Sequence, residues 1–136
     1  MVRRPPLRAL LAALLLAPLL NGCLLLSGEQ TTIDLLAGAG NLSTTFVSAE
    51  GGEERTVQVG KGSAELQAIA VVSLESGDLQ IELLQPDGSV AFAIAGRPDT
   101  QMTRSGPVRG DASGTVRYRV SARGAHNGSF QIFFQP

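Results

Sequence analysis

Short stretches in which every second residue is apolar restrict the fold of this chain more than any other feature. In the stretch 64–74, alanine, leucine and valine occupy the even-numbered positions. A period of two places one set of side chains on one face of an extended strand. The same alternation recurs at 56–59, 78–84, 115–122 and 130–134. Strands with one buried face are therefore expected, and no helical period is found beyond the leucine-rich start.

Turn-forming residues separate these stretches about every ten residues. Ser76-Gly77 and Asn127-Gly128 are expected to close hairpins, and Pro86-Asp87-Gly88 to form a further turn. Residues 48–54 are interpreted as a glycine-rich acidic turn, and 96–113 as an irregular segment with a short edge strand near 102–108. About seven to nine short strands of this kind predict an all-β protein, an antiparallel and jelly-roll-like β-sandwich.

The first 22 residues have the composition of an export signal. Arg3, Arg4 and Arg8 precede an apolar run at 9–20. That run is short for a membrane-spanning helix but suits the apolar core of a signal peptide. The arginines are expected to remain in the cytoplasm while the rest of the chain is exported.

The residues Leu20-Asn21-Gly22-Cys23 resemble the lipobox of bacterial lipoproteins. The resemblance implies cleavage between Gly22 and Cys23 and attachment of diacylglycerol to the Cys23 thiol, so that membrane lipid becomes a partner. Each buried methylene contributes about 0.8 kcal/mol, and two or three acyl chains make such an anchor effectively permanent. The expected location is the cell membrane or the outer membrane, with the domain facing the periplasm or the exterior.

Two other interpretations of the N-terminus remain open. Leu24, Leu25 and Leu26 extend the apolar run to about the minimum length of a tilted span, so an uncleaved signal anchor would place the domain on the same side. Arg3-Arg4 would allow twin-arginine export, although Pro5-Pro6 and the leucine-rich core fit the general secretory route better.

Composition limits the remainder to one domain with few classes of partner. The expected organisation is a signal peptide at 1–22, a lipidated N-terminus and short polar tether at 23–31, and a β-sandwich domain at 32–136. The single cysteine allows no internal disulfide. Removing the signal leaves eight basic and twelve acidic residues, a net charge of −4, which makes nucleic acid an unsuitable partner. Acidic residues gather in 29–87 and arginines in 97–123, which indicates cross-strand pairing on solvated faces.

The order of the strands and turns resembles the group of jelly-roll-like modules that includes the pre-peptidase C-terminal domain and the proprotein-convertase P-domain. The resemblance covers roughly residues 55–134 and implies a non-catalytic accessory or binding role, without naming a site. The matching pieces are Val57-Gln58-Val59, Gly77-Asp78-Leu79-Gln80-Ile81, Pro86-Asp87-Gly88, Tyr118-Arg119-Val120 and Gly128-Ser129-Phe130-Gln131-Ile132.

No residue pattern typical of catalysis is found. His126 is the sole histidine, and the only cysteine, Cys23, is expected to carry lipid. No free cysteine therefore remains to act as a nucleophile paired with histidine. The Gly-x-Ser-x-Gly pattern of hydrolases is absent. An enzyme would require an acid–base pair such as Glu53 and Asp111 to meet in a cleft. The chain is therefore predicted not to be an enzyme and to need no cofactor.

Candidate ligand sites are few. Asp87, Asp99 and Asp111 could supply oxygen ligands to calcium, but they lack the spacing of an EF-hand and each also suits a turn. A shallow groove lined by Tyr118 and Phe133 would favour glycan or peptide binding. The expected function is non-catalytic binding or structural association at the cell envelope. The alternatives are a small envelope enzyme, an accessory subunit of a secreted or surface hydrolase, and a glycan-binding or calcium-dependent adhesion module.

Overall fold

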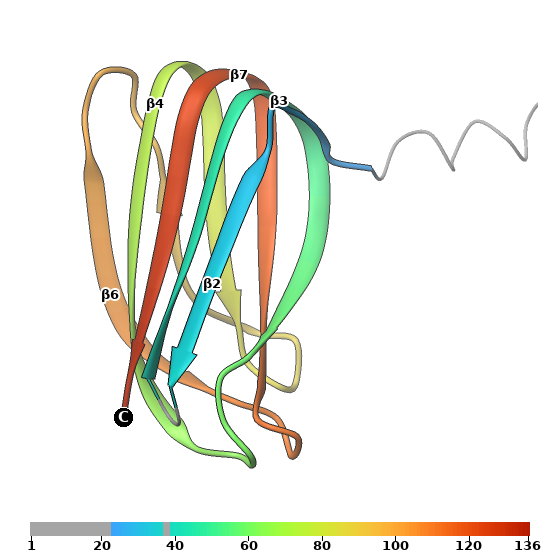
Figure 1. Cartoon of the computed structure of the whole chain (residues 1–136), viewed down its shortest axis with the longest axis vertical. Coiled ribbons are helices and arrows are strands. Elements are labelled where there is room, and N and C mark those ends of the chain that lie inside the picture. The colour runs from blue at the N-terminus through green and yellow to red at the C-terminus, as the bar shows by residue number, and fades with distance from the viewer. Residues whose placement is uncertain (1–22, 37–38) are drawn as a thin grey trace, which may run out of the picture.

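The computed structural model describes residues 23–36 and 39–136 (Figure 1). The expected signal peptide and its helix, at 1–22, lie outside the described residues. Every regular element in the described part is a strand, as the alternation predicts, and no helix there has the length and hydrophobicity of a membrane span. The strands are β1 (Leu25–Ser27), β2 (Gln30–Leu36), β3 (Ala39–Gln58), β4 (Glu65–Leu84), β5 (Val90–Ala95), β6 (Met102–Arg109) and β7 (Thr115–Gln135).

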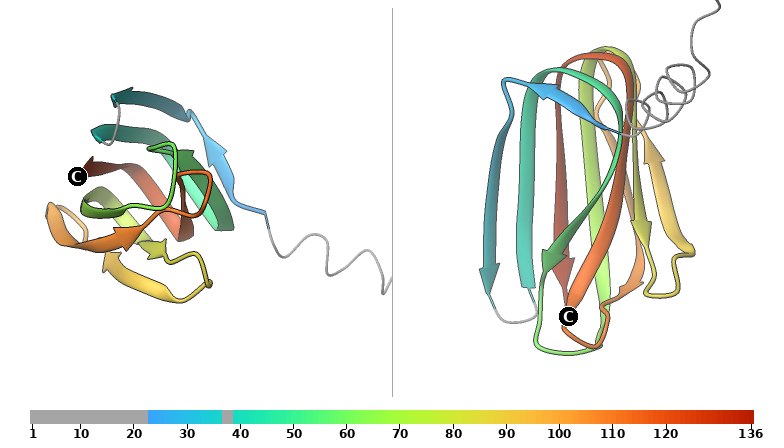
Figure 2. Two further views of the ribbon diagram at one scale, coloured as in Figure 1. Left: turned by 90° about the horizontal axis from the view of Figure 1, so that it is seen from below. Right: turned by 90° about the vertical axis from the view of Figure 1, so that its right-hand side faces the viewer.

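Three long strands pass through both layers of the β-sandwich. β3, β4 and β7 contain 20, 20 and 21 residues, and each bends near its middle (Figure 2). On one side of the bends the order is β2–β3–β7–β4–β6, which we call the five-strand layer. On the other side it is β3–β7–β4–β5, the four-strand layer. All neighbouring strands are antiparallel, which confirms the predicted class of fold.

Three expected turns are wrong because the strands continue through them. Residues 48–54 belong to β3, Ser76-Gly77 belongs to β4, and Asn127-Gly128 belongs to β7. Glycine next to a small polar residue is typical of a hairpin, but it also suits a bulge or a sharp bend inside a strand. The local sequence is therefore the same for a hairpin, in which the chain reverses, and for a bend, in which the strand continues.

Glycines with positive φ make the bends. Gly51, Gly77 and Gly124 have φ of 99°, 87° and 55°, a region that L side chains rarely adopt. The strand register shifts between Ala49 and Gly51 and again between Ser76 and Asp78. These glycines mark one end of the sandwich, which we call the bend end. The opposite end, which we call the loop end, carries the connections 59–64, 85–89 and 110–114.

Alternation correctly predicted which side chains fill the core. The apolar sets of both halves of β4 and β7 point between the layers, and the expected edge strand near 102–108 is β6. The turn at 86–88 is confirmed, since the Gly88 N–H donates to the Gln85 carbonyl at 2.9 Å. Buried residues that the alternation identified are Leu66, Ala68, Ala70, Val72, Leu74, Leu79, Ile81, Leu83, Val116, Tyr118, Val120, Phe130, Ile132 and Phe134.

The segment 23–31, expected to be a tether, contributes strands to the sandwich. β1 pairs with β3 from Leu25 opposite Glu50 to Ser27 opposite Ser48, and β2 begins at Gln30. Leu24 and Leu26 pack against the core as partly buried side chains. The ordered sandwich therefore begins within two residues of Cys23.

Acidic and basic residues from the two halves of the chain pair across strands, as their segregation predicted. Arg119 of β7 lies between Glu54 of β3 and Glu82 of β4, with N–O distances of 2.9 and 2.8 Å. These groups are partly exposed to solvent, so each pair contributes little to stability. The pairs do place opposite charges next to each other on neighbouring strands.

Polar contacts close the two open sides between the layers. On one side Arg55 of β3 contacts Glu29, which precedes β2, at 2.6 Å. On the other side the Arg104 guanidinium of β6 donates to the Ala93 carbonyl of β5 at 2.7 Å. Covering an edge strand in this way reduces its ability to pair with another chain.

Candidate functional site

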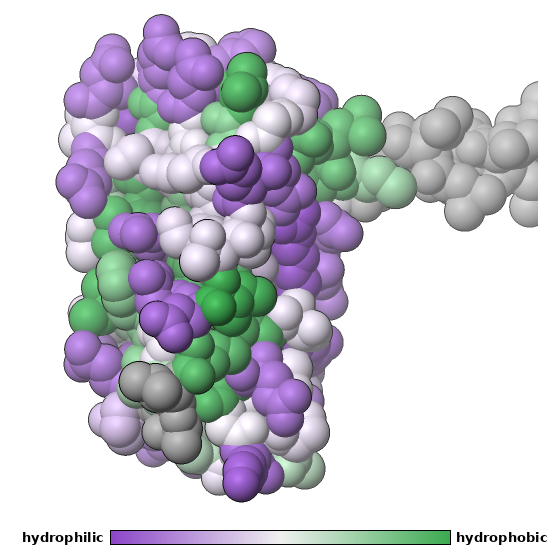
Figure 3. Space-filling model, in the orientation of Figure 1, coloured by the Kyte–Doolittle hydropathy of each residue, from purple (hydrophilic) through white to green (hydrophobic). Residues whose placement is uncertain are grey.

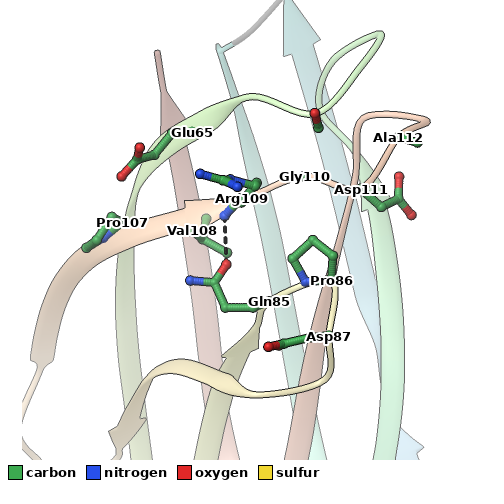
Figure 4. A pocket seen from close by; sticks show the side chains of 11 residues that line it. Glu65, Gln85, Pro86, Asp87, Pro107, Val108, Arg109, Gly110, Asp111 and Ala112 are labelled. Carbon is green, nitrogen blue, oxygen red and sulfur yellow. Dashed lines mark hydrogen bonds between the residues drawn. The ribbon is translucent and has the colours of Figure 1, made fainter.

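The loop end carries a cleft bounded by the connections 59–64, 85–89 and 110–114. Its volume is about 600 Å³, and its walls come from the start of β4, the 85–89 turn and the end of β6 with the 110–114 turn (Figure 4). We call it the loop-end cleft. The polar side chains that line it are Ser63, Glu65, Gln85, Asp87, Arg109 and Asp111.

Asp87 and Asp111 build the turns on which they lie. Asp87 Oδ1 accepts hydrogen bonds from the Ser89 hydroxyl and backbone N–H at 2.6 and 2.9 Å. Asp111 Oδ1 accepts from the hydroxyl and N–H of Ser113 at 2.6 and 2.9 Å and from the Thr115 N–H at 3.0 Å. The hydroxyl bonds, followed by the backbone bonds, lower the pKa of both carboxyls. Both are therefore ionised at neutral pH, and Oδ2 is the oxygen that a ligand would meet.

Hydrogen bonds tie the walls of the cleft together. The Arg109 N–H donates to Gln85 Oε1 at 3.0 Å, drawn as the dashed line in Figure 4. Arg117 Nη2 donates to the Pro86 carbonyl at 3.2 Å, and the Gly110 N–H donates to the Ala64 carbonyl at 3.1 Å. The 85–89 turn is thus bonded to β6 and β7, and the start of β4 is bonded to the residue that follows β6. A cleft held in this way is largely formed before a ligand arrives.

Apolar surface lies between the polar groups. Pro86, Pro107 and Val108 line the cleft beside the charged residues. A second hollow of about 680 Å³, bordered by Leu35 and Lys61 among others, shares Ser63 and Gly110 with it. Carboxylates outnumber the one lining arginine, so the loop-end cleft does not favour anions. It suits an uncharged or cationic ligand with both polar groups and C–H faces.

The three aspartates considered as candidate calcium ligands do not gather. Asp87 and Asp111 both line the loop-end cleft. The Asp99 N–H donates to the Leu74 carbonyl at 3.0 Å, close to Gly77, which places Asp99 at the bend end. Among the described residues, no group of three or more histidine, cysteine or acidic side chains is placed to hold a metal ion.

The acid–base pair that an enzyme would require does not form. Glu53 lies on β3 and accepts a hydrogen bond from Arg55 at 3.2 Å, whereas Asp111 lies in the 110–114 turn. Within the cleft, the Glu65 and Asp111 carboxylates point to opposite sides in Figure 4. His126 is exposed on β7, and it borders a different hollow at the bend end.

Tyr118 and Phe133 do not line a common groove in the described part of the chain. Tyr118 is 3% exposed and its ring lies 6.3 Å from that of Phe130 inside the core. Burial raises the pKa of its hydroxyl. Phe133 lies on the outer face of the five-strand layer, between Asn41 and Ile69. That face shows hydrophobic patches among near-neutral and hydrophilic side chains and no deep hollow (Figure 3).

Sequence reasoning did not identify Glu65, Gln85 or Arg109 as site residues. Each lies at the end of a strand, and the pairs that meet are far apart in sequence, such as Glu65 opposite Arg109 in the β4–β6 register. The proline turn beside Gln85 was the one local sequence feature that pointed to this part of the cleft. It indicated a loop without showing which other loops surround it.

Comparisons with known proteins show likeness only in the fold. No family model matches the sequence, and no curated protein matches it. A carbohydrate-binding module of Cellvibrio mixtus lichenase 5A, solved in complex with cellotriose, matches with a TM-score of 0.41 and 18% identity over 82% of this chain and 89% of the module. The C-terminal module of the laminarinase LamC from Zobellia galactanivorans gives a TM-score of 0.41 and 11% identity, over 84% of this chain and 100% of that chain.

A third solved structure, the xylan-binding domain CBM22-1 of Paenibacillus barcinonensis Xyn10C, gives a TM-score of 0.40 at 13% identity. The match covers 82% of this chain and 83% of that domain. Because all three TM-scores lie below 0.5 and all three identities lie below 20%, nothing about the ligand of this chain follows from them.

Proposed function

We propose that this chain is a lipid-anchored, non-catalytic binding module of the cell envelope. The loop-end cleft takes a polyhydroxylated ligand such as part of a glycan. The single observation that carries the proposal is the cleft itself, in which side chains from three separate connections surround a volume of about 600 Å³. That volume is within the range of about 300–1,000 Å³ that small-molecule sites occupy.

The chemistry of the cleft favours sugar hydroxyls. Carboxylate oxygens of Glu65, Asp87 and Asp111 accept hydrogen bonds, while the Arg109 guanidinium and the Gln85 amide donate them. The ring of Pro86 supplies an apolar surface against which the C–H face of a sugar can pack. The acidic excess opposes phosphate or sulfate groups, so the preferred glycan is neutral or amino-substituted.

The acid–base properties of Asp87 and Asp111 support binding without turnover. The lowered pKa values of Asp87 and Asp111 make them poor proton donors at neutral pH, and their bonds to Ser89 and Ser113 already commit one oxygen each. A glycosidase needs one carboxylic acid with a raised pKa. The cleft is therefore better suited to holding a ligand than to cleaving it.

Titration calorimetry with a panel of neutral, amino-substituted and acidic oligosaccharides tests the proposal. Glu65→Gln and Arg109→Gln should each weaken binding about two- to tenfold, the loss expected for one hydrogen bond of 0.5–1.5 kcal/mol. Asp78→Asn, a charge change on an exposed residue at the bend end, is the matched control and should bind as the parent does. If all three variants bound with the affinity of the parent, the ligand would have to bind elsewhere. Cleavage of the oligosaccharide would contradict the non-catalytic role.

The anchor requires a separate test at Cys23. In Cys23→Ser, loss of lipid should abolish processing, so intact mass should report the unprocessed precursor and detergent partitioning should fall. A product with unchanged mass and partitioning would refute lipidation and favour the uncleaved signal anchor. In an envelope with two membranes, Leu24 in place of aspartate resembles the pattern of lipoproteins passed to the outer membrane, which fractionation tests.

A further inference from the structure

The residue proposed to carry the lipid lies directly against the bend end of the sandwich. A Cβ built on Gly51 would lie 2.1 Å from the Cys23 carbonyl oxygen, so the backbone of Cys23 packs on the bend of β3. Leu24 is partly buried against the core, and β1 pairs with β3 from Leu25 onward. One residue spans at most about 3.6 Å. A membrane anchor at Cys23 would therefore bring the bend end to within a few ångströms of the bilayer.

The same end exposes apolar side chains. Leu25 is 69% exposed, and Val47, on the strand beside β1, is 56% exposed. The chain emerges from the body among hydrophobic side chains in Figure 3. A hollow of about 410 Å³ lies beside Leu25, and its border combines apolar residues such as Ala49 with polar ones such as Glu50 and His126. The exposed Leu25 and Val47 side chains, rather than the hollow, are the apolar surface that lipid would cover.

Several charged side chains at the bend end already make hydrogen bonds within the protein. Glu50 accepts a hydrogen bond from the Gly124 N–H at 2.5 Å, and Glu75 accepts one from Asn127 Nδ2 at 2.5 Å. Asp78 lies opposite Arg123 in the β4–β7 register. Among these charged residues, three are acidic and one is basic. Contact of this part of the described chain with a membrane would therefore depend on apolar burial and the anchor, and little on anionic lipid.

We infer that the bend end rests on the bilayer and that the loop-end cleft is presented at the far end of the sandwich, away from the membrane. The inference rests on the proposed anchoring, and it holds for a lipidated Cys23 and for an uncleaved apolar segment alike. The bilayer is the occupant because either form of the anchor, lipid on Cys23 or the uncleaved apolar run at 9–20, would enter the membrane directly beside this end. The 11 residues from 39 to 49 cross the five-strand layer, so the cleft lies roughly 30–35 Å from the lipid surface at 3.3 Å per residue.

The test uses the full protein, purified from membranes and reconstituted in vesicles of phosphatidylcholine with a headgroup-labelled quencher lipid. Two variants, Ser76→Cys at the bend end and Ala112→Cys in the 110–114 turn, each place a fluorophore at an exposed residue. The parent, treated with the same reagent, shows whether Cys23 itself takes up label, and its signal is subtracted. Strong quenching at 76 and little at 112 is the expected result. The inference would be overturned by equal quenching at the two sites or by stronger quenching at 112. It would also be overturned by quenching at neither site, which is the result expected if two copies associate through their bend ends.

Two controls separate the orientation from the anchor. Sedimentation of the protein with the vesicles is measured on the same samples. Failure to sediment refutes the anchoring and the orientation together. Sedimentation without stronger quenching at 76 than at 112 refutes the orientation alone. Leu25→Ser should lower quenching at 76, while Ile33→Ser, at a residue 52% exposed on β2, should leave it unchanged. Equal effects of the two serine variants would also contradict the proposed contact.

Discussion

Replacing Gly77 with alanine tests the bent-strand architecture directly. Gly77 has φ of 87°, and a Cβ there would lie 2.1 Å from the Gly124 carbonyl oxygen on the neighbouring strand. Two other glycines serve as matched controls. Gly124 has φ of 55° with no atom within 4 Å of a built Cβ, and Gly62 has open space around it without a positive φ. The three substitutions separate chain entropy, backbone conformation and steric clash.

The magnitudes follow from these three terms. Gly62→Ala should stabilise the protein by about 0.4–1 kcal/mol, because alanine lowers the entropy of the unfolded chain. Gly124→Ala gains the same term but holds alanine at positive φ, at a cost of about 1–2 kcal/mol, for a net loss near 1 kcal/mol. Gly77→Ala adds a contact that is relieved only if backbone moves by about 1 Å, and overpacking of this kind costs about 1–3 kcal/mol. The expected loss at Gly77 is therefore about 2–4 kcal/mol.

Urea unfolding of residues 24–136, followed by circular dichroism, measures the series. Equal m-values would show that the midpoint shifts report stability alone. The expected order of stability is Gly62→Ala, then the parent, then Gly124→Ala, then Gly77→Ala. If Gly77→Ala and Gly124→Ala differed by less than about 0.5 kcal/mol, strands β4 and β7 would not approach each other at the bend as described, and a hairpin at 76–77 would again have to be considered.

Three further results are expected. Ile81→Ala, at a residue 0% exposed, should cost about 2–5 kcal/mol in the same assay, while exposed Gln80→Ala should cost less than about 0.5 kcal/mol; similar losses would mean that the faces of β4 are reversed. The Arg55 guanidinium lowers the pKa of the Glu29 carboxyl, so the contribution of this pair to stability is present above about pH 4.5 and is lost as pH falls through the lowered pKa. Glu29→Gln should flatten that part of the curve of stability against pH, and an unchanged curve would contradict the contact. Residues 31–136 should still give a β-type circular dichroism spectrum but unfold about 2–4 kcal/mol more easily than 24–136, since Leu24 and Leu26 no longer pack on the core; equal stability would show that β1 adds nothing.

Local patterns were sufficient wherever the physics is local. Alternation in 78–84 placed Leu79 and Ile81 in the core because successive side chains of a strand point to opposite faces, whatever the strand pairs with. Pro86-Asp87-Gly88 predicted a turn because the Asp87 side chain bonds to backbone within two residues of itself. Segregation of acids and arginines predicted pairs such as Arg119 with Glu54, although not their partners one by one.

The sequence alone thus determined the class of fold, the buried faces and the proline turn, whereas export of the chain stays a prediction. Only the tertiary structure decided that the chain continues through 48–54, Ser76-Gly77 and Asn127-Gly128 instead of reversing there. Glycine permits positive φ in a hairpin and in a bend alike, so the outcome depends on which strands are available as partners on either side. The loop-end cleft was undetermined for the same reason: its walls come from connections that are distant in sequence, and long-range strand pairing brings them to one end of the sandwich.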